Sequence, residues 1–262
     1  MPKITDLPLA TILDADDLLY AVVDSNSRRI PARSLSGRNL IINGSGRINQ
    51  RGYVSGTATT GANQFSLDRW FVVTSGESLS FTGTNARRVM TATGGVGQVI
   101  EGANIVGGSY VLNWDGDATV TVNGTARAKG ETFTLTANAN VVVVFSSGTF
   151  TDVQLEAGIT ATPFELRSLG QELALCQRFY QQINLRSRWD AGDSGWVDAR
   201  HYPHPVTMRA TPSVTFSGVT SVNATSVTLN STGITANYNV QSIGAGPVDH
   251  QALYMFSAEL TS

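Results

Sequence analysis

The chain has 262 residues, a formal net charge of −2 and one cysteine. Its near balance of basic and acidic residues leaves no electrostatic footprint for nucleic-acid binding, which normally shows as a basic stripe. The lone Cys176 excludes an intrachain disulfide. No stretch approaches the roughly 20 apolar residues of a membrane helix, and the first ten residues lack a signal-peptide pattern. We therefore expect a soluble protein, made in a cytoplasm and without membrane insertion.

Small and β-branched residues dominate the composition, with 29 Thr, 26 Gly and 24 Ser. Threonine favours strands because its branched Cβ packs on a pleated surface, whereas Gly and Ser supply turns. The composition predicts an all-β protein built from many short strands.

Residues 1–36 form a small unit of their own. Residues 18–24 (LLYAVVD) and 28–35 (RRIPARSL) are two predicted strands, the second an edge strand because it contains Pro31. Two strands bury too little surface to be stable alone. We therefore expect this segment to dock on another protein.

Residues 37–166 predict a β-sandwich. Strand and turn patterns alternate at intervals of about 8–12 residues, which is typical of two-sheet sandwiches. The strongest turn signal is Asn123-Gly124, between ATVTV and TARAK. The pattern favours a jelly-roll-type sandwich.

Residues 167–186 predict a helical junction. Ser168 and Gln171 fit a capping box. Five apolar residues follow at spacings of 4, 3, 4 and 3, which matches a coiled-coil seam: Leu169, Leu173, Cys176, Tyr180 and Ile183. An isolated helix of this length is marginal in water. It packs either on its own sandwich or, through this seam, on copies of itself at a trimer axis.

Residues 187–262 predict a C-terminal antiparallel β-domain. Its first part gathers aromatic and histidine side chains, which we take as a candidate glycan or receptor site: Trp189, Trp196, His201 and Tyr202. An aromatic ring offers the flat apolar face and polar edge that suit a sugar. Asp190, Asp193 and Asp198 are candidate acceptors for sugar hydroxyls. The alternative is that both tryptophans form the domain core.

Catalytic motifs are absent from the sequence. There is no G-x-S-x-G elbow, no Walker loop and no dinucleotide fingerprint. His201 and His204 lack the HExxH pattern of a zinc site. We expect no enzyme activity and no cofactor. The weak metal candidates are Asp152 and Glu156, whose oxygens would suit a structural Ca²⁺.

Two blocks resemble bacteriophage tail-fibre and receptor-binding proteins. They are NLIINGSGRINQRG with FSLDRW, and DVQLEAGITATPFELRSLGQELALCQRFYQ. The opening KITDLPLATILDADDLLYAVVDSNSRRIPARSL is similar to segments that attach such fibres to the virion. The resemblance implies a homotrimer in a tail fibre or spike, made in the host bacterial cytoplasm. Residues 1–36 would bind other tail, baseplate or head proteins.

The sequence thus predicts a structural virion protein that attaches a phage or phage-like particle to a host surface polysaccharide or other receptor. Two alternatives stay open. One is a head-borne fibre or decoration protein with the same modules. The other is a depolymerase that cuts surface polysaccharide, although such enzymes usually use long β-helices with repeats that this chain lacks.

Overall fold

The computed structural model describes residues 18–23, 26–31 and 37–260. Strands dominate these residues, which contain one α-helix, α1 (Leu169–Gln177). The all-β prediction is confirmed. Among the described residues no helix is long and apolar enough to be a candidate membrane span.

The N-terminal unit is a β-hairpin. β1 (Leu18–Val23) pairs antiparallel with β2 (Asn26–Pro31), from Val23 opposite Asn26 to Leu18 opposite Pro31. This confirms the two predicted strands, although the second begins at Asn26. The predicted continuation over residues 32–35 lies outside the described residues, as do residues 1–17. The docking role of this unit stays a prediction.

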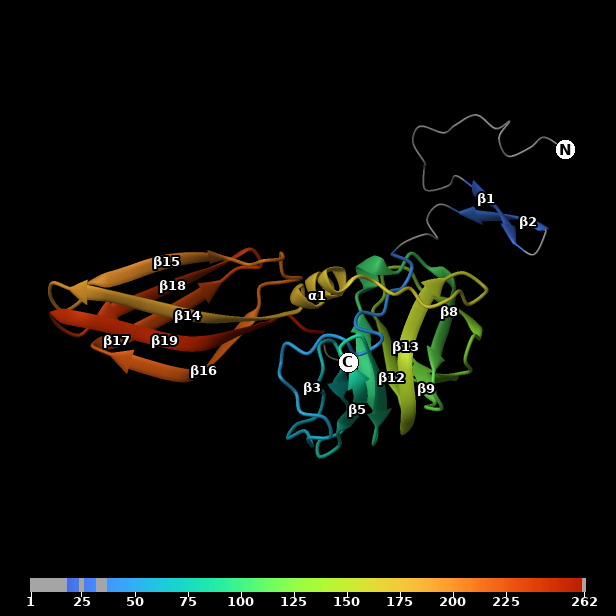
Figure 1. The fold of residues 1–262 in the computed structure, drawn as a ribbon, viewed down its shortest axis with the longest axis horizontal. Coiled ribbons are helices and arrows are strands. Elements are labelled where there is room, and N and C mark those ends of the chain that lie inside the picture. The colour runs from blue at the N-terminus through green and yellow to red at the C-terminus, as the bar shows by residue number, and fades with distance from the viewer. Residues whose placement is uncertain (1–17, 24–25, 32–36, 261–262) are drawn as a thin grey trace.

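The next domain is a sandwich of two antiparallel sheets (Figure 1). The sheet orders are β10-β9-β12-β7-β4-β3 and β11-β8-β13-β6-β5. Among the eight strands from β6 to β13, one sheet has the order β6-β13-β8-β11 and the facing sheet has the order β7-β12-β9-β10. This is the strand order of a jelly roll. The strands are β3 (Gln64–Phe65), β4 (Phe71–Val72), β5 (Leu79–Thr84), β6 (Arg87–Ala92), β7 (Val96–Ile100), β8 (Gly108–Asp115), β9 (Val120–Val122), β10 (Thr125–Arg127), β11 (Thr132–Leu135), β12 (Val141–Phe145) and β13 (Gly148–Ala157).

Aromatic rings fill the centre of the jelly roll. The Phe145 and Phe150 rings stack with their centroids 4.4 Å apart, and Trp70 lies 5.3 Å from Phe150. The predicted turn at Asn123-Gly124 joins β9 to β10, with positive φ at both residues, as a two-residue hairpin turn requires.

The helix begins where it was predicted and ends early. The Ser168 side chain accepts from the Gln171 backbone N–H, and the Gln171 side chain accepts from the Ser168 N–H, so the capping box is present. The helix ends at Gln177, because β14 (Tyr180–Ala191) then pairs over its whole length with β19 (Gly246–Ser257). From Tyr180 onward the backbone N–H and C=O groups form hydrogen bonds between strands, so they are not available for the hydrogen bonds of a longer helix.

The predicted two-heptad seam is therefore wrong. Cys176 and Tyr180 are buried against their own chain, and Ile183 packs on the C-terminal core as part of a strand. Of the five predicted seam residues, only Leu169, which is 48% exposed, and the half-buried Leu173 both lie on the helix and have accessible surface. Burial and the nearby Asp68 and Glu172 charges raise the pKa of the Cys176 thiol well above its usual value.

The C-terminal domain is a second sandwich, which begins at Tyr180 rather than at residue 187. Its sheets have the orders β14-β19-β16 and β15-β18-β17. Alternate residues of β18 and β19 face the core, among them Tyr238, Val240, Tyr254 and Phe256. The remaining strands are β15 (Val197–Pro203), β16 (Ser213–Val222), β17 (Ala224–Ser231) and β18 (Thr235–Ser242).

Buried charges join the two sandwiches, which lie end to end with α1 between them (Figure 1). Glu259, just after β19, accepts from Arg51 at 2.9 Å and also from Arg69 of the jelly roll. The Arg69 guanidinium lies 3.6 Å from the ring centroid of Phe179. Because the Arg69 side chain is 1% exposed, this contact fixes the C-terminal sandwich on the jelly roll.

Candidate functional site: the distal tip of the C-terminal sandwich

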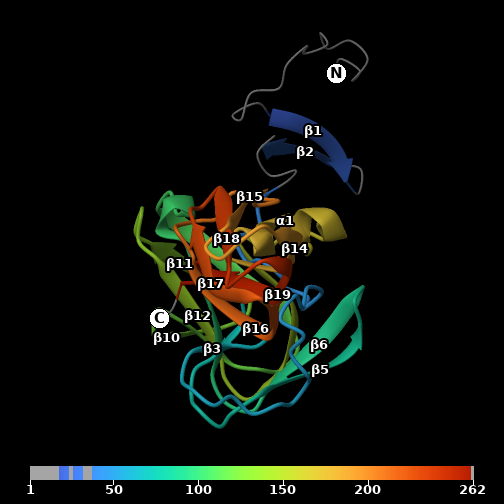
Figure 2. The same cartoon turned by 90° about the vertical axis from the view of Figure 1, so that its left-hand side faces the viewer.

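Three connections meet at the end of the C-terminal sandwich that is farthest from the jelly roll (Figures 1 and 2). They are residues 192–196 between β14 and β15, Asn223 between β16 and β17, and residues 243–245 between β18 and β19. We call this end the distal tip. β14 spans twelve residues, so the tip lies roughly 40 Å from the start of the domain at about 3.3 Å per residue.

Ser242 holds the first loop in place. Its hydroxyl donates to the Asp193 carbonyl at 2.7 Å and accepts from the Trp196 N–H at 3.0 Å. Its backbone N–H donates to the Trp196 carbonyl at 2.8 Å, and its carbonyl accepts from Gly195 at 3.0 Å. Ser242 is fully buried, so the conformation of this loop is set by the end of β18.

Asn223 joins the other two connections. It adopts a positive φ of 50°, which asparagine tolerates better than most residues. Its side-chain amide donates to the Gly244 carbonyl at 2.9 Å and accepts from the Gly244 N–H at 3.0 Å. The Asn223 carbonyl accepts from Ile243 at 3.1 Å. All three connections are thus tied to their neighbours before any ligand arrives.

Trp196 is the large aromatic side chain of this tip, and it is 55% exposed. One end of its ring system lies against Gly192, where an added Cβ would approach ring atoms to 2.7 Å. Val197, Val222 and Ile243 are also more than half exposed at the same end. The tip therefore presents a supported indole among exposed aliphatic side chains.

The other predicted site residues do not gather around Trp196. Trp189 faces inward from β14 and packs on the C-terminal core, as the alternative prediction stated. Tyr202 also packs on that core, with its ring centroid 6.3 Å from Tyr238. His201 is exposed on the opposite face of β15, with Nδ1 2.6 Å from Asn237 Oδ1.

The predicted four-residue cluster is therefore wrong, and strand geometry explains why. Successive residues of a strand point to opposite faces, so His201 and Tyr202 cannot share one. Both also lie toward the far end of β15 from Trp196, roughly 17–20 Å along the strand. Of the four, only Trp196 belongs to the tip.

The three aspartates separate in the same way. Asp190 and Asp193 are exposed at the tip. Asp198 faces the interior, where it accepts from the Ser187 hydroxyl at 2.5 Å and from Arg200 Nε at 2.6 Å. A pair of free carboxylates, as glycoside hydrolysis requires, would have to come from Asp190 and Asp193 alone.

The sequence interpretation missed Val222, Asn223, Ser242 and Ile243. A usable signal was present for Ile243, which precedes Gly244 and stands in the glycine-rich stretch SIGAG, where an isoleucine has little chance of burial. Ser242 carried no such signal, because its role depends on a partner loop about 50 residues earlier in the chain.

The calcium candidates are engaged within the jelly roll. Asp152 accepts from Arg87 Nε at 2.7 Å. Glu156 accepts from the Thr162 backbone and hydroxyl at 2.8 and 2.7 Å and from Gln154 at 2.8 Å. Within the described ranges no three His, Cys, Asp or Glu side chains form a group that could hold a metal ion. His204, which the sequence analysis did not favour as a zinc ligand, is buried, with its ring nitrogens 2.8 Å from Gln181 and 2.9 Å from Ser231.

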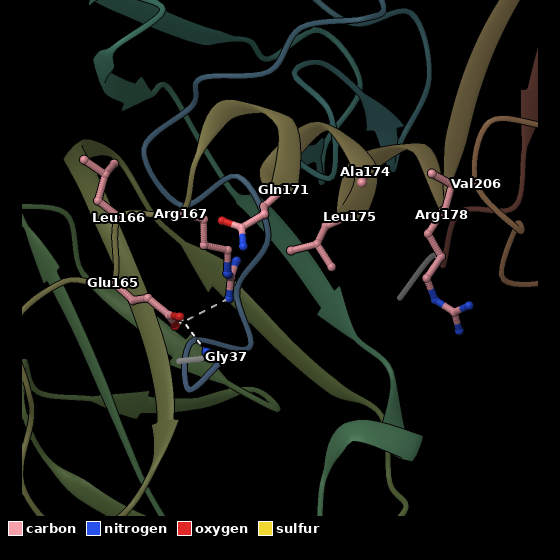
Figure 3. Close-up of a pocket in the computed structure, with 9 residues that line it drawn as sticks. All are labelled: Gly37, Glu165, Leu166, Arg167, Gln171, Ala174, Leu175, Arg178 and Val206. Atoms are coloured by element: carbon pink, nitrogen blue, oxygen red, sulfur yellow. Dashed lines mark hydrogen bonds and ion pairs between the residues drawn. The ribbon is translucent and has the colours of Figure 1, made fainter. Parts of the chain in front are cut away.

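A cavity of about 700 Å³ lies beside α1 (Figure 3). Leu175 and Gln171 of the helix face Glu165 and Gly37 across it. Burial alone would raise the pKa of Glu165, but hydrogen bonds from the backbone of Asn39 and Gly37 outweigh this and lower it. Four polar side chains line the cavity, and each one already hydrogen-bonds or ion-pairs within the chain: Glu165, Arg167, Gln171 and Arg178. We therefore interpret the cavity as part of the packing around the helix and not as a ligand site.

No family model matches the chain, and no curated protein matches it. Two solved structures, both of discoidin II of Dictyostelium discoideum, share a weak similarity. The native recombinant protein is 11% identical, over 86% of this chain and 94% of that one, with a TM-score of 0.23. The wild-type protein is 10% identical, over 93% and 98%, with the same TM-score. A similarity at this level carries no argument about function.

Proposed function

We propose that this chain is a structural attachment protein that binds a glycan on a cell surface through its distal tip. The observation that carries the proposal is Trp196, half exposed yet held by a loop that Ser242 fixes. An indole ring offers a sugar an apolar face at low conformational cost, and a preformed loop reduces the entropy lost on binding.

The setting of the proposal is a trimeric tail fibre or spike of a phage or phage-like particle. It is supported by the sequence resemblance and by the arrangement of the domains, in which the tip lies at the far end of the molecule from the jelly roll. The hairpin of residues 18–31 would attach to tail, baseplate or head proteins. A head-borne fibre with the same modules is distinguished by electron microscopy of labelled virions.

The test is binding of the purified full-length protein to an array of bacterial surface polysaccharides, followed by titration of any polysaccharide that is retained. We expect Trp196→Ala to weaken binding at least tenfold and Trp196→Phe to weaken it less, because a ring remains. Ile234→Ala is the matched control, since Ile234 is 64% exposed but lies between β17 and β18, at the opposite end of the domain. Equal affinity of wild type and Trp196→Ala would disprove the tip site.

The same titrations examine the depolymerase alternative. An attachment protein leaves the polysaccharide intact, so reducing ends should not accumulate over hours of incubation. Their release by wild type, and its loss in Asp190→Asn or Asp193→Asn, would replace the attachment proposal with an enzymatic one.

A further inference from the structure

The C-terminal sandwich has two very different sides. On one side, the edge strands β14 and β15 carry charged side chains that reach solvent: Arg186, Arg188, Asp190 and Arg200. On the other side, the edge strands β16 and β17 carry none, and the chain has no Asp, Glu, Lys or Arg from Ala210 to Val248. Charged side chains are a common means by which exposed sheet edges avoid pairing with other chains. The β16–β17 side lacks this protection.

A groove of about 360 Å³ runs between β16 and β17. It opens onto apolar side chains that a single chain leaves uncovered: Phe216 is 62% exposed and Val219 46%. The Phe216 ring contacts Tyr254 at the base, with centroids 5.8 Å apart. Val214, Val227 and Leu229 complete the apolar wall.

A bulge keeps the apolar residues of β16 on the groove side. The register with β19 shifts between Ser217 and Thr220, and Gly218 adopts a φ of 62°. Without the shift, strict alternation after Phe216 would turn Gly218 and Thr220 toward the groove. With it, Val219 and Ser221 line the groove instead. Bulges re-aim side chains in this way, so the exposed apolar strip is a built feature of the fold.

The geometry points to this groove as the surface through which copies of the chain associate. Phe216 and Val219 are both large apolar side chains with about half of their surface exposed, and a contiguous exposed apolar patch on a monomer is often functional. An interface of standard size buries about 800 Å² per partner, so the strip supplies an apolar core that the Ser and Thr residues of β16 surround as a polar rim. A surface without charges is complementary to another surface without charges, and every copy of the chain brings one.

This inference goes beyond glycan binding but rests on the trimer of the proposed function, and it places the contact between copies on β16 and β17 instead of on the helix seam. The test is the mass of the full-length protein by light scattering at micromolar concentration. Wild type should have the mass of three 27.8 kDa chains. Phe216→Asp and Val219→Asp should each raise the protein concentration below which the trimer dissociates by a factor on the order of 100, because each variant buries an unpaired carboxylate. Val106→Asp, at an 80% exposed position of the jelly roll, is the matched control and should stay trimeric.

Three results would overturn the inference: a monomeric wild type, groove variants that keep the wild-type mass, or loss of the trimer in Leu169→Asp but not in Phe216→Asp. Circular dichroism checks that each variant is folded. If the groove variants do not fold, hydrogen exchange of wild type decides, since β16 amides must exchange more slowly at high protein concentration. Trp196→Ala should keep the trimeric mass, so failure of the glycan site and failure of this interface are separate outcomes.

Discussion

The carboxylate of Glu259 is bound by Arg69 across the junction of the two sandwiches, and both side chains are almost completely buried, 4% and 1% exposed. Arg51 binds the same carboxylate at 2.9 Å and lies over the Tyr180 ring. The end of the C-terminal domain is thereby fixed to the jelly roll by a desolvated charge cluster. Because these charges are desolvated, loss of one partner would leave the other buried without compensation.

Removal of this carboxylate should be costly. Glu259→Ala leaves Arg69 buried without its charge partner, which costs about 3–5 kcal/mol in comparable cases. The free energy of unfolding in urea measures it, and we expect the C-terminal sandwich to unfold before the jelly roll. Arg87→Ala is the control, since the half-exposed Arg87 side chain makes surface ion pairs worth at most about 1 kcal/mol. A Glu259→Ala loss no larger than that of the control would refute the role of the cluster.

The two tryptophans of the C-terminal domain should respond oppositely to truncation. Trp189→Ala removes a ring packed on the core and should destabilise the protein by about 3 kcal/mol. Trp196→Ala removes a side chain that is mostly in solvent and should change stability by less than about 0.5 kcal/mol. Thermal unfolding of both variants compares them directly. Similar losses in the two would mean that Trp196 is part of the core.

Two buried histidines should make the protein acid-sensitive. Burial lowers the pKa of His204 and of His250. The unfolded chain, with histidine pKa values near 6.5, therefore takes up protons before the folded one. The contribution of the two neutral histidines to the free energy of unfolding is therefore fully present above about pH 6.5. It is lost as the pH drops from there through their lowered pKa values in the folded protein. Urea unfolding of wild type between pH 7 and about 5 should show this slope, and the double variant His204→Gln, His250→Gln should flatten it.

An unchanged slope in that double variant would assign the acid sensitivity to other groups. Below that pH range, the carboxyl of Glu165, whose pKa is lowered, should contribute to the loss of stability in acid. Its contribution is present above the unfolded pKa of about 4.3 and is lost as the pH falls further, so the two effects occupy different ranges.

Local patterns predicted the fold well. The Asn123-Gly124 turn and the Ser168 cap depend on residues within four positions, and both are present. The helix length depended on β19, whose pairing with β14 begins at Tyr180 opposite Ser257. No local pattern reports a partner so far along the chain, and the seam spacing from Leu169 to Ile183 continued across the boundary by coincidence.

The site residues were predicted less well, because exposure depends on strand phase. Ser187 and Ala191 are buried on β14, so Trp189 between them faces inward by alternation. A predicted strand that began at Tyr180 would have shown this alternation in the sequence. Trp196 escapes the alternation because Gly192 and Gly195 interrupt it with a loop. The aromatic cluster in the sequence was real, but the strands distribute it over two faces and one tip.

Support of the indole by Gly192 provides the sharpest test of the tip. An alanine Cβ at this position would lie 2.7 Å from two atoms of the Trp196 ring, at the far end of a side chain that can move. Gly192 does not have a positive φ, so the backbone accepts alanine without strain. Gly192→Ala should therefore displace the indole and leave the fold intact.

We expect Gly192→Ala to weaken polysaccharide binding nearly as much as Trp196→Ala, with a change in stability below about 1 kcal/mol. Ser194→Ala is the control, because Ser194 is an exposed residue of the same loop. Tryptophan fluorescence of Gly192→Ala should shift as the indole moves into solvent. A shifted spectrum with unchanged affinity would show that the ring moves without consequence, and the ligand surface would then have to lie away from Trp196.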